Sequence, residues 1–155
     1  MSREDIIFRL AERADLPSIV RLLADDDMGS QRERNEEPLP ESYYAAFEKI
    51  NDDANHELIV AELGGEVVGT VHLMFLTSIS FQGALRAQIE SVRVDRKHRA
   101  HGIGSKMLKW AIERAKGRGA HIVQLTTHMS RKDAHRFYER LGFKGTHLGM
   151  KLSLK

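Results

Sequence analysis

The stretch from Val92 to Leu108 constrains the fold more than any other part of this chain. It reads VRVDRKHRAHGIGSKML: a β-branched run, a basic loop with two glycines, and a helical pattern that begins at Ser105. The first turn of a helix leaves backbone N–H groups without partners, and the helix dipole favours negative charge there. Glycine has no Cβ, so the backbone can approach a ligand closely. This order is typical of an anion site, although a purely structural turn with a solvated basic face gives the same pattern.

The segments before this stretch alternate between strand and helix patterns. Apolar residues at three-to-four spacing predict one helix after Asp15 and another over residues 41–50. Residues 28–40 are polar and carry two of the three prolines, which predicts a loop. Strands are expected at residues 6–12, 58–63, 67–76 and 85–95, with a tight hairpin turn at Gly64-Gly65.

The segments after it complete an α/β pattern. A helix is expected up to Gly117, a buried strand at 121–127, a second helix opened by a capping box from Ser130 to Asp133, and a final strand at 143–154. The prediction is one domain over residues 1–155, with a mixed, mostly antiparallel sheet of six to seven strands and about four helices. A helix follows each of the two late strands, so these strands are expected to be parallel and to bind ligand at their carboxyl ends.

The apolar alternation slips by one residue next to the glycine loop. Apolar side chains fall at Ala87 and Ile89 and then at Val92 and Val94. A strand with a period of two residues cannot do this without turning over, so the slip predicts a β-bulge at Glu90-Ser91 that splays the strand from its neighbour. A strand buried on both faces would explain the pattern equally well.

Composition excludes several classes of protein. The 155 residues are 41% hydrophobic and 30% charged, which fits one globular domain with a real core. A net charge of +2 does not indicate nucleic-acid binding, and no nucleic-acid-binding motif accompanies the basic residues between Arg93 and Lys109. The absence of cysteine excludes disulfides and thiolate chemistry. No apolar run approaches the roughly 20 residues of a membrane span, and no signal peptide is evident, so we expect a cytoplasmic protein without membrane contact.

Two nucleotide-binding motifs and a metal site are disfavoured by spacing. No glycine stands five residues before Gly104, as the phosphate loop of nucleotide hydrolases requires. Met107 occupies the place of the third glycine of a dinucleotide fingerprint. His98 and His101 are close in sequence but lack the spacing of metal ligands, so no metal is expected. What remains is an R-x-x-G-x-G arrangement from Arg99 to Gly104.

At these residues the chain resembles the GNAT-type N-acetyltransferases. Arg99 to Gly104 matches the family signature Q/R-x-x-G-x-G/A at every fixed position, and AHRFYERLGF at residues 134–143 resembles the family's downstream A-x-x-F/L-Y-x-x-x-G-F segment. The resemblance covers nearly the whole chain in element order. It implies an acyltransferase that binds acetyl-CoA as cosubstrate and moves its acetyl group to an acceptor, usually an amine.

The resemblance also implies site residues. Backbone N–H groups of the glycine loop would bind the coenzyme A pyrophosphate, and one strand would bind the pantetheine arm and the thioester carbonyl. The loop residues are Arg99, Ala100, His101, Gly102, Ile103, Gly104 and Ser105, and the strand residues are Val92, Arg93 and Val94. Many relatives carry an asparagine seven residues before the tyrosine of the downstream segment. This chain has Arg131 there, so the asparagine's role is not transferred.

Two residues are candidates for proton transfer. Tyr138 occupies the position of the family's general acid, which protonates the departing thiolate. A tyrosine that only packs its helix against the sheet is the structural alternative. Glu90 is the candidate base, directly or through a water, with a solvated or salt-bridged strand residue as the alternative.

The sequence does not identify the acceptor. Residues 28–44 would cover the acceptor site, and their acidic excess favours a cationic small molecule, although a peptide amine fits as well. The alternative to an enzyme is an acyl-CoA-binding sensor or regulatory protein with little catalysis. Homodimers are common among relatives.

Overall fold

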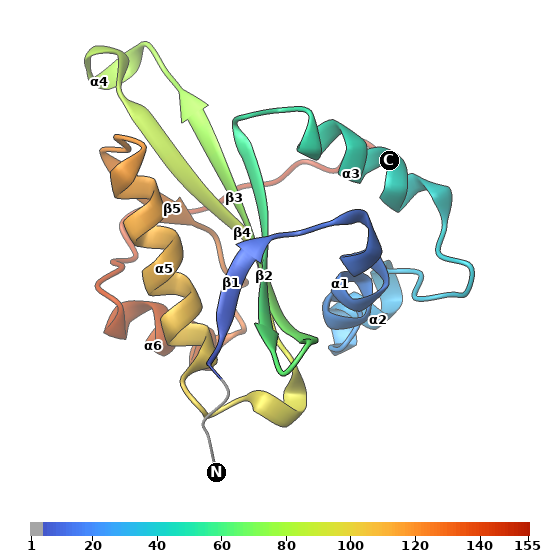
Figure 1. Ribbon diagram of the computed structural model, residues 1–155. Coiled ribbons are helices and arrows are strands. Elements are labelled where there is room, and N and C mark those ends of the chain that lie inside the picture. The colour runs from blue at the N-terminus through green and yellow to red at the C-terminus, as the bar shows by residue number, and fades with distance from the viewer. Residues whose placement is uncertain (1–4) are drawn as a thin grey trace. The chain divides into compact units, whose positions relative to one another are not determined.

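The computed structural model describes residues 5–155 as two compact units, one that ends at Gln124 and a second of Leu125–Lys155. The first unit holds most of the sheet and all helices except one (Figure 1). The second holds a single helix, α6 (Lys132–Arg140). The expectation that residues 1–155 form one domain stays a prediction.

The described residues contain one five-stranded sheet in the order β1-β2-β3-β4-β5. Each of the first three neighbouring pairs is antiparallel. Gly64 and Gly65 join β2 to β3 with φ values of 58° and 81°, which is the left-handed backbone that a two-residue hairpin needs. The strands are β1 (Ile7–Leu10), β2 (His56–Leu63), β3 (Glu66–Thr77), β4 (Leu85–Val94) and β5 (Ile122–Leu125).

Strand β5 lies beside β4 at the start of both strands. The His121 backbone N–H donates to the Leu85 carbonyl at 2.9 Å, and Gln124 Nε2 donates to Gln88 Oε1 at 2.7 Å. The two contacts advance together along the chain, so β5 runs in the same direction as β4. This agrees with the parallel pair expected from the helix crossover.

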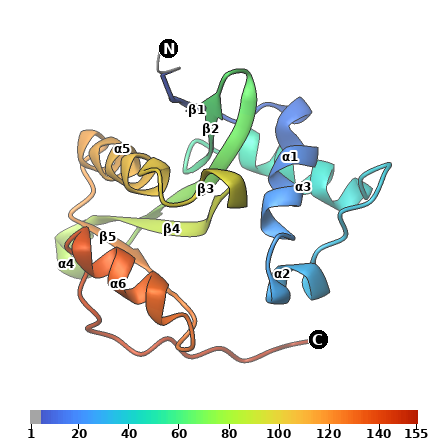
Figure 2. The same cartoon turned by 90° about the horizontal axis from the view of Figure 1, so that it is seen from below.

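Helices cover both faces of the sheet in the first unit. Figure 2 shows α1 and α3 on one side of the strands and α5 on the other. Pro17 lies in the first turn of α1, where its missing N–H costs nothing. The helices of this unit are α1 (Leu16–Leu23), α2 (Asp27–Arg32), α3 (Glu41–Asn51), the short α4 (Ser80–Gly83) and α5 (Ile103–Gly117), together with 3₁₀ turns at Arg13–Asp15 and Arg96–His98. None of the helices in residues 5–155 is long and apolar enough to cross a membrane.

Each covered face has its own buried apolar layer. Val20 of α1 and Phe47 of α3 pack with Val60 of β2. On the other face a Cβ at Gly69 would lie 3.4 Å from the Met107 sulfur, so α5 sits close against β3 there. Both layers are apolar and hold the sheet between the helices.

Two predictions about the architecture were wrong. Residues 5–155 hold five strands rather than six to seven and six α-helices rather than about four. The predicted final strand at 143–154 does not form. At the start of this segment the N–H groups of Phe143 and Thr146 donate within local turns, to the carbonyls of Tyr138 and Lys144. The extra helices are α2 and α4. Helix α2 lies where a loop was predicted, and the Asp26 carboxylate caps it by accepting from the Gly29 N–H at 2.5 Å.

Candidate active site

The predicted β-bulge is present in β4. His72 of β3 pairs with Glu90, but Thr70, two residues earlier, pairs with Arg93, so one residue of β3 faces two of β4. Ser91 absorbs the extra length with a φ of 56°. The slip in apolar alternation is therefore a bulge and not a strand buried on both faces. The neighbour from which β4 was expected to splay continues into the second unit, so the splaying stays a prediction.

The glycine loop, residues 99–105, leads directly into α5. Gly102 caps that helix with a φ of 79°, and a Cβ added there would meet nothing within 4 Å. The space in front of Gly102 is open, while Ile103 is buried and anchors the first turn of the helix. The arrangement presents backbone N–H groups of the helix start to open space, as an anion site requires.

Acidic residues at the end of α1 hold the basic side chains around this loop. Asp25 Oδ2 lies 3.9 Å from Arg99 Nη2, and the Asp25 backbone carbonyl accepts from Arg96 Nη2 at 3.1 Å. Asp26 Oδ2 lies 3.5 Å from Arg93 Nη2. Sequence reasoning missed these pairs, because the two segments are about 70 residues apart. The pairing leaves the loop backbone as the surface that a bound anion would meet.

Glu90 lies half-buried on β4, directly before the bulge. Its Oε1 accepts a hydrogen bond from Gln88 Nε2 at 3.0 Å, and its register partner on β3 is His72. Glu90 lies on the same strand as Val92, Arg93 and Val94, and its role as a base stays a prediction.

A small cavity of about 140 Å³ lies between α1, α3 and the bulge. Most of its lining is apolar, from residues such as Leu16, Val20 and Phe47. Its polar groups come from Tyr43, Thr70, His72 and Ser91. The cavity therefore reaches the bulge on one side and the segment predicted to cover the acceptor on the other.

His72 is the most perturbed histidine of the site. Burial, with the nearby His56 as a second cause, lowers its pKa to about 4. His56 Nδ1 lies 2.9 Å from His72 Nε2, within hydrogen-bond distance. Sequence reasoning missed this pair. The predicted strand began at residue 58, so His56 fell outside it, whereas the structure begins β2 at His56.

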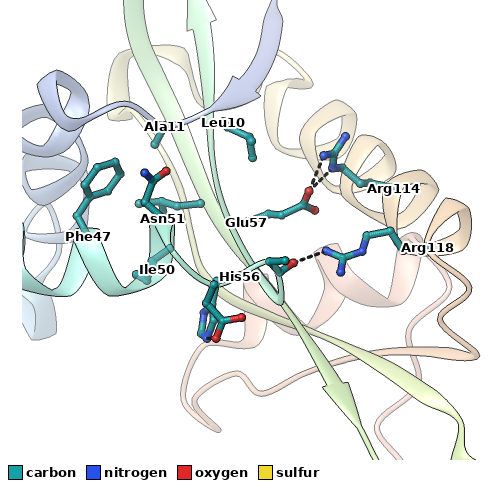
Figure 3. Close-up of a pocket in the computed structure, with 12 residues that line it drawn as sticks. Leu10, Ala11, Phe47, Ile50, Asn51, His56, Glu57, Arg114 and Arg118 are labelled. Carbon is teal, nitrogen blue, oxygen red and sulfur yellow. Dashed lines mark hydrogen bonds and ion pairs between the residues drawn. The ribbon is translucent and has the colours of Figure 1, made fainter.

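A larger cavity of about 410 Å³ opens at the edge of β2, beyond the end of β1. Figure 3 shows Phe47, Ile50 and Asn51 on one side, Arg114 and Arg118 on the other, and His56 and Glu57 between them. Glu57 is buried and accepts from Arg114 Nε at 2.7 Å. Arg118 donates to the Ala54 carbonyl at 2.8 Å. His56 lines this large cavity, whereas His72 lines the small one.

Tyr138 belongs to the second unit. It is half-buried on α6, with its ring 5.2 Å from that of Phe137 and 5.9 Å from that of Phe143, centroid to centroid. Its approach to the glycine loop stays a prediction. The predicted capping box at the start of this helix was wrong: Arg131 occupies the N-cap position without a side-chain capping bond, and the Ser130 hydroxyl lies 2.7 Å from His128 Nδ1.

No group of three or more histidine, aspartate and glutamate side chains is arranged for a metal ion within residues 5–155. The candidate site consists of backbone N–H groups, a strand bulge, one carboxylate and one half-buried imidazole.

Comparison with known proteins points to one family. The family model described as "Acetyltransferase (GNAT) family" matches residues 18–143. An aminoalkylphosphonate N-acetyltransferase from Salmonella typhimurium is 37% identical over 95 residues, which are 61% of this chain and 61% of that protein. The matched region thus spans less than two thirds of this relative's own length.

Solved structures have the same fold. A protein from Bacillus halodurans C-125, described as a transcriptional regulator, is 50% identical, with a TM-score of 0.94 over 97% of this chain and 100% of that one. A "predicted acetyltransferase" from Clostridium acetobutylicum, crystallised with acetyl-CoA, is 19% identical, with a TM-score of 0.75 over 97% of each chain.

Proposed function

The chain belongs to the acetyltransferase (GNAT) family, and from this membership we propose that it moves an acetyl group from acetyl-CoA directly to the nitrogen of an amine. The observation that carries the proposal is the bulge at Ser91 next to the open glycine loop. A bulge interrupts ladder pairing and turns backbone groups away from the neighbouring strand. An extended pantetheine arm needs such groups, and a pyrophosphate needs the helix start beside them.

The loop backbone, from Arg99 to Ser105, would hold the pyrophosphate. The side chains of Arg93, Arg96 and Arg99 already contact Asp25 or Asp26. They would therefore contribute positive potential around the loop, while the direct contacts to the phosphates would come mainly from the backbone. Val92 to Val94 would hold the pantetheine arm and orient the thioester carbonyl. Holding both reactants in the reactive orientation accounts for much of the rate enhancement of a direct transfer.

The chemical step needs a base for the amine and an acid for the thiolate. As the carbon–nitrogen bond forms and the carbon–sulfur bond breaks, the amine loses one proton and the thiolate gains one. Tyr138 is the proposed acid. Glu90 is the candidate base named by the sequence, and its place before the bulge, at the edge of the proposed thioester site, supports it.

The small cavity is the proposed acceptor site. The acidic excess of residues 28–44, which favours a cationic acceptor, is reduced by local pairing: Arg32 binds Glu33 at 2.6 Å and Arg34 binds Glu36 at 2.9 Å. The lining itself is mostly apolar. We therefore favour a small primary amine on a short carbon skeleton. The Salmonella relative's acceptor, an aminoalkylphosphonate, belongs to this size class.

The exposed end of the chain supports self-association. Leu148, Met150, Leu152 and Leu154 alternate along residues 148–154 and are 72–89% exposed. Alternating apolar side chains suit a strand that pairs with another strand. We propose a homodimer. Changing Leu152 to Glu should convert a species of twice 17.6 kDa into a monomer in sedimentation analysis. A wild-type chain that sediments as a monomer at all concentrations would refute this.

An amine panel tests the function. The chain is incubated with acetyl-CoA and, in separate reactions, polyamines, aminoglycosides, N-terminal peptides, aminoalkylphosphonates and arylalkylamines, and thiol release is recorded. Release that requires a small amine supports the proposal. Stabilisation by coenzyme A, without turnover on any amine, would support the sensor role, which the family relatives do not favour. No response to coenzyme A would overturn both.

A further inference from the structure

The two cavities of the first unit are joined by a pair of hydrogen-bonded imidazoles. His72 lines the small cavity and His56 lines the large one. His72 Nε2 lies 2.9 Å from His56 Nδ1, and the ring centroids are 5.1 Å apart. On the far side, His56 Nε2 lies 3.7 Å from Asp53 Oδ2. Three titratable groups therefore lie in sequence from the proposed acceptor site to the large cavity, with a hydrogen bond between the first two and a 3.7 Å ion-pair contact to the third.

We propose that Asp53, His56 and His72 form a proton exit for the acetyl transfer. His72 takes the proton that leaves the attacking amine, and His56 passes a proton on to Asp53 and to solvent in the large cavity. The inference rests on the proposed function, because it assigns the base of that reaction. It makes His72 the catalytic residue and His56 a residue that acts through it.

The geometry allows the proton transfers to balance. In the resting state both imidazoles carry their proton on Nε2, so His72 Nε2 donates to His56 Nδ1 and His56 Nε2 points to the Asp53 carboxylate. When the amine nitrogen bonds to the thioester carbon, its proton moves to His72 Nδ1. The Nε2 proton of His72 moves to His56 Nδ1, and the Nε2 proton of His56 moves to Asp53 or water. Each ring gains one proton and loses one, and the carbon–sulfur bond breaks independently of this line.

The surroundings of His72 favour a residue that passes a proton on over a residue that stays protonated. Burial makes an imidazolium at this position costly, and its pKa is lowered to about 4. A proton that arrives at Nδ1 must therefore leave from Nε2 almost at once, which the bond to His56 permits. The half-buried His56 has 31% of its side chain exposed and Asp53 has 48%, so the positive charge can be released at that end.

The groups that face His72 fit this role. Its register partner on β4 is Glu90, its partner on β2 is Leu58, and Tyr43 of α3 lines the same cavity. Helix α1 contributes only apolar lining residues there. Glu90 accepts from Gln88, so its carboxylate is engaged within its own strand. His72 in turn is bonded to His56, which lines the large cavity.

Three variants test the exit: His72→Ala, His56→Gln and, as a matched control, the exposed His147→Gln. The wild-type chain and each variant are assayed with acetyl-CoA and the best amine of the panel. We expect His72→Ala to lose about 10²- to 10⁴-fold in kcat with little change in KM for acetyl-CoA, and added imidazole to restore part of the rate. His56→Gln should lose less, and His147→Gln nothing.

Solvent isotope effects separate a proton role from a packing role. The dependence of kcat on the fraction of D₂O should be curved in wild type, because several protons move together, and linear in His56→Gln. If wild type is active and both variants keep its kcat, or if His56→Gln keeps the curvature, the exit does not exist. If wild type transfers acetyl to no amine, the proposed function itself has failed. Should His72→Ala not fold, the His56→Gln isotope data decide alone.

Discussion

Arg99 and Asp25 lie opposite each other across the entrance to the glycine loop, with 3.9 Å between Arg99 Nη2 and Asp25 Oδ2. The arginine of the family signature thus already has a carboxylate partner on the end of α1. Its side chain is half-exposed and shares this partner with Arg96. An exposed ion pair of this kind contributes little to stability, about 1 kcal/mol at most. Under the proposed function, this pairing would leave the loop backbone as the main ligand of the pyrophosphate.

The first prediction compares the side chain of Arg99 with the backbone at Gly102. Arg99→Ala should weaken acetyl-CoA binding less than tenfold. Gly102→Asn keeps the left-handed backbone at a modest cost, but puts a side chain into the open space and should weaken binding more than tenfold. Titration calorimetry measures both. An Arg99→Ala effect larger than that of Gly102→Asn would mean that side chains carry the phosphate contact.

The second prediction concerns the bulge. Ser91 has a φ of 56°, which a β-branched residue adopts only with strain. Ser91→Val should destabilise the fold by about 1–2 kcal/mol and lower the affinity for acetyl-CoA, since the bulge would rearrange. Ser91→Gly, the matched control, should retain the wild-type stability and the wild-type affinity for acetyl-CoA. If the two variants bind acetyl-CoA with equal affinity, cofactor binding does not depend on the bulge.

The third prediction tests the acid. Tyr138→Phe keeps the ring that packs edge-on against Phe137 and Phe143, so the melting temperature should hardly change. If the hydroxyl protonates the thiolate, kcat should fall about 10²- to 10⁴-fold, while the KM for acetyl-CoA stays near the wild-type value. Steady-state kinetics with unchanged kcat would show that Tyr138 only packs its helix.

The fourth prediction concerns stability and pH. Two hydrogen bonds from Arg9, at 2.7 and 3.0 Å, hold the pKa of the buried Asp15 below its ordinary value of 3.8. A lowered folded-state pKa stabilises the fold above pH 3.8, and this contribution is lost as the pH falls through the folded-state value. Arg9→Leu should cost about 2 kcal/mol at pH 7, less than for a fully buried pair, because the Arg9 side chain is 30% exposed.

Urea titrations of Arg9→Leu and wild type at several pH values check this. The difference in the free energy of unfolding should shrink on acidification, because protonation removes the buried charge that Arg9 compensates. A difference that stays constant between pH 7 and pH 3 would show that Arg9 acts through packing alone.

Much of the first unit follows from local pattern. The apolar periods of α1, α3 and α5, the Gly64-Gly65 turn and the slip at Ser91 all report short-range geometry, and the structure confirms them. Helix α2 was missed because its cap, Asp26, lies inside an acidic run that looks like a solvated helix end. The predicted final strand is absent from the described residues: β5 is the last strand, and the N–H groups of Phe143 and Thr146 donate within local turns.

Only part of the chemistry of the candidate site could be predicted from the sequence. The glycine loop leads into α5 and Glu90 lies on β4, and their roles in binding and catalysis stay predictions. The imidazole pair was not foreseen, because the pairing of His56 with His72 depends on the register between β2 and β3, which is set by the whole hairpin. The acidic partners of the arginines depend on how α1 packs on the sheet. Contacts of this kind arise from tertiary structure and leave no periodic signal in the sequence.

Residue-resolved amide hydrogen exchange with and without acetyl-CoA tests the central claim most directly. If Val92 to Val94 and the glycine loop bind the cosubstrate through their backbone, their N–H groups should become the most strongly protected in the chain on binding, with Gly104 and Ser105 foremost. Amides lining the large cavity should change little. Protection concentrated at the large cavity, or none at the loop at saturating acetyl-CoA, would contradict the account.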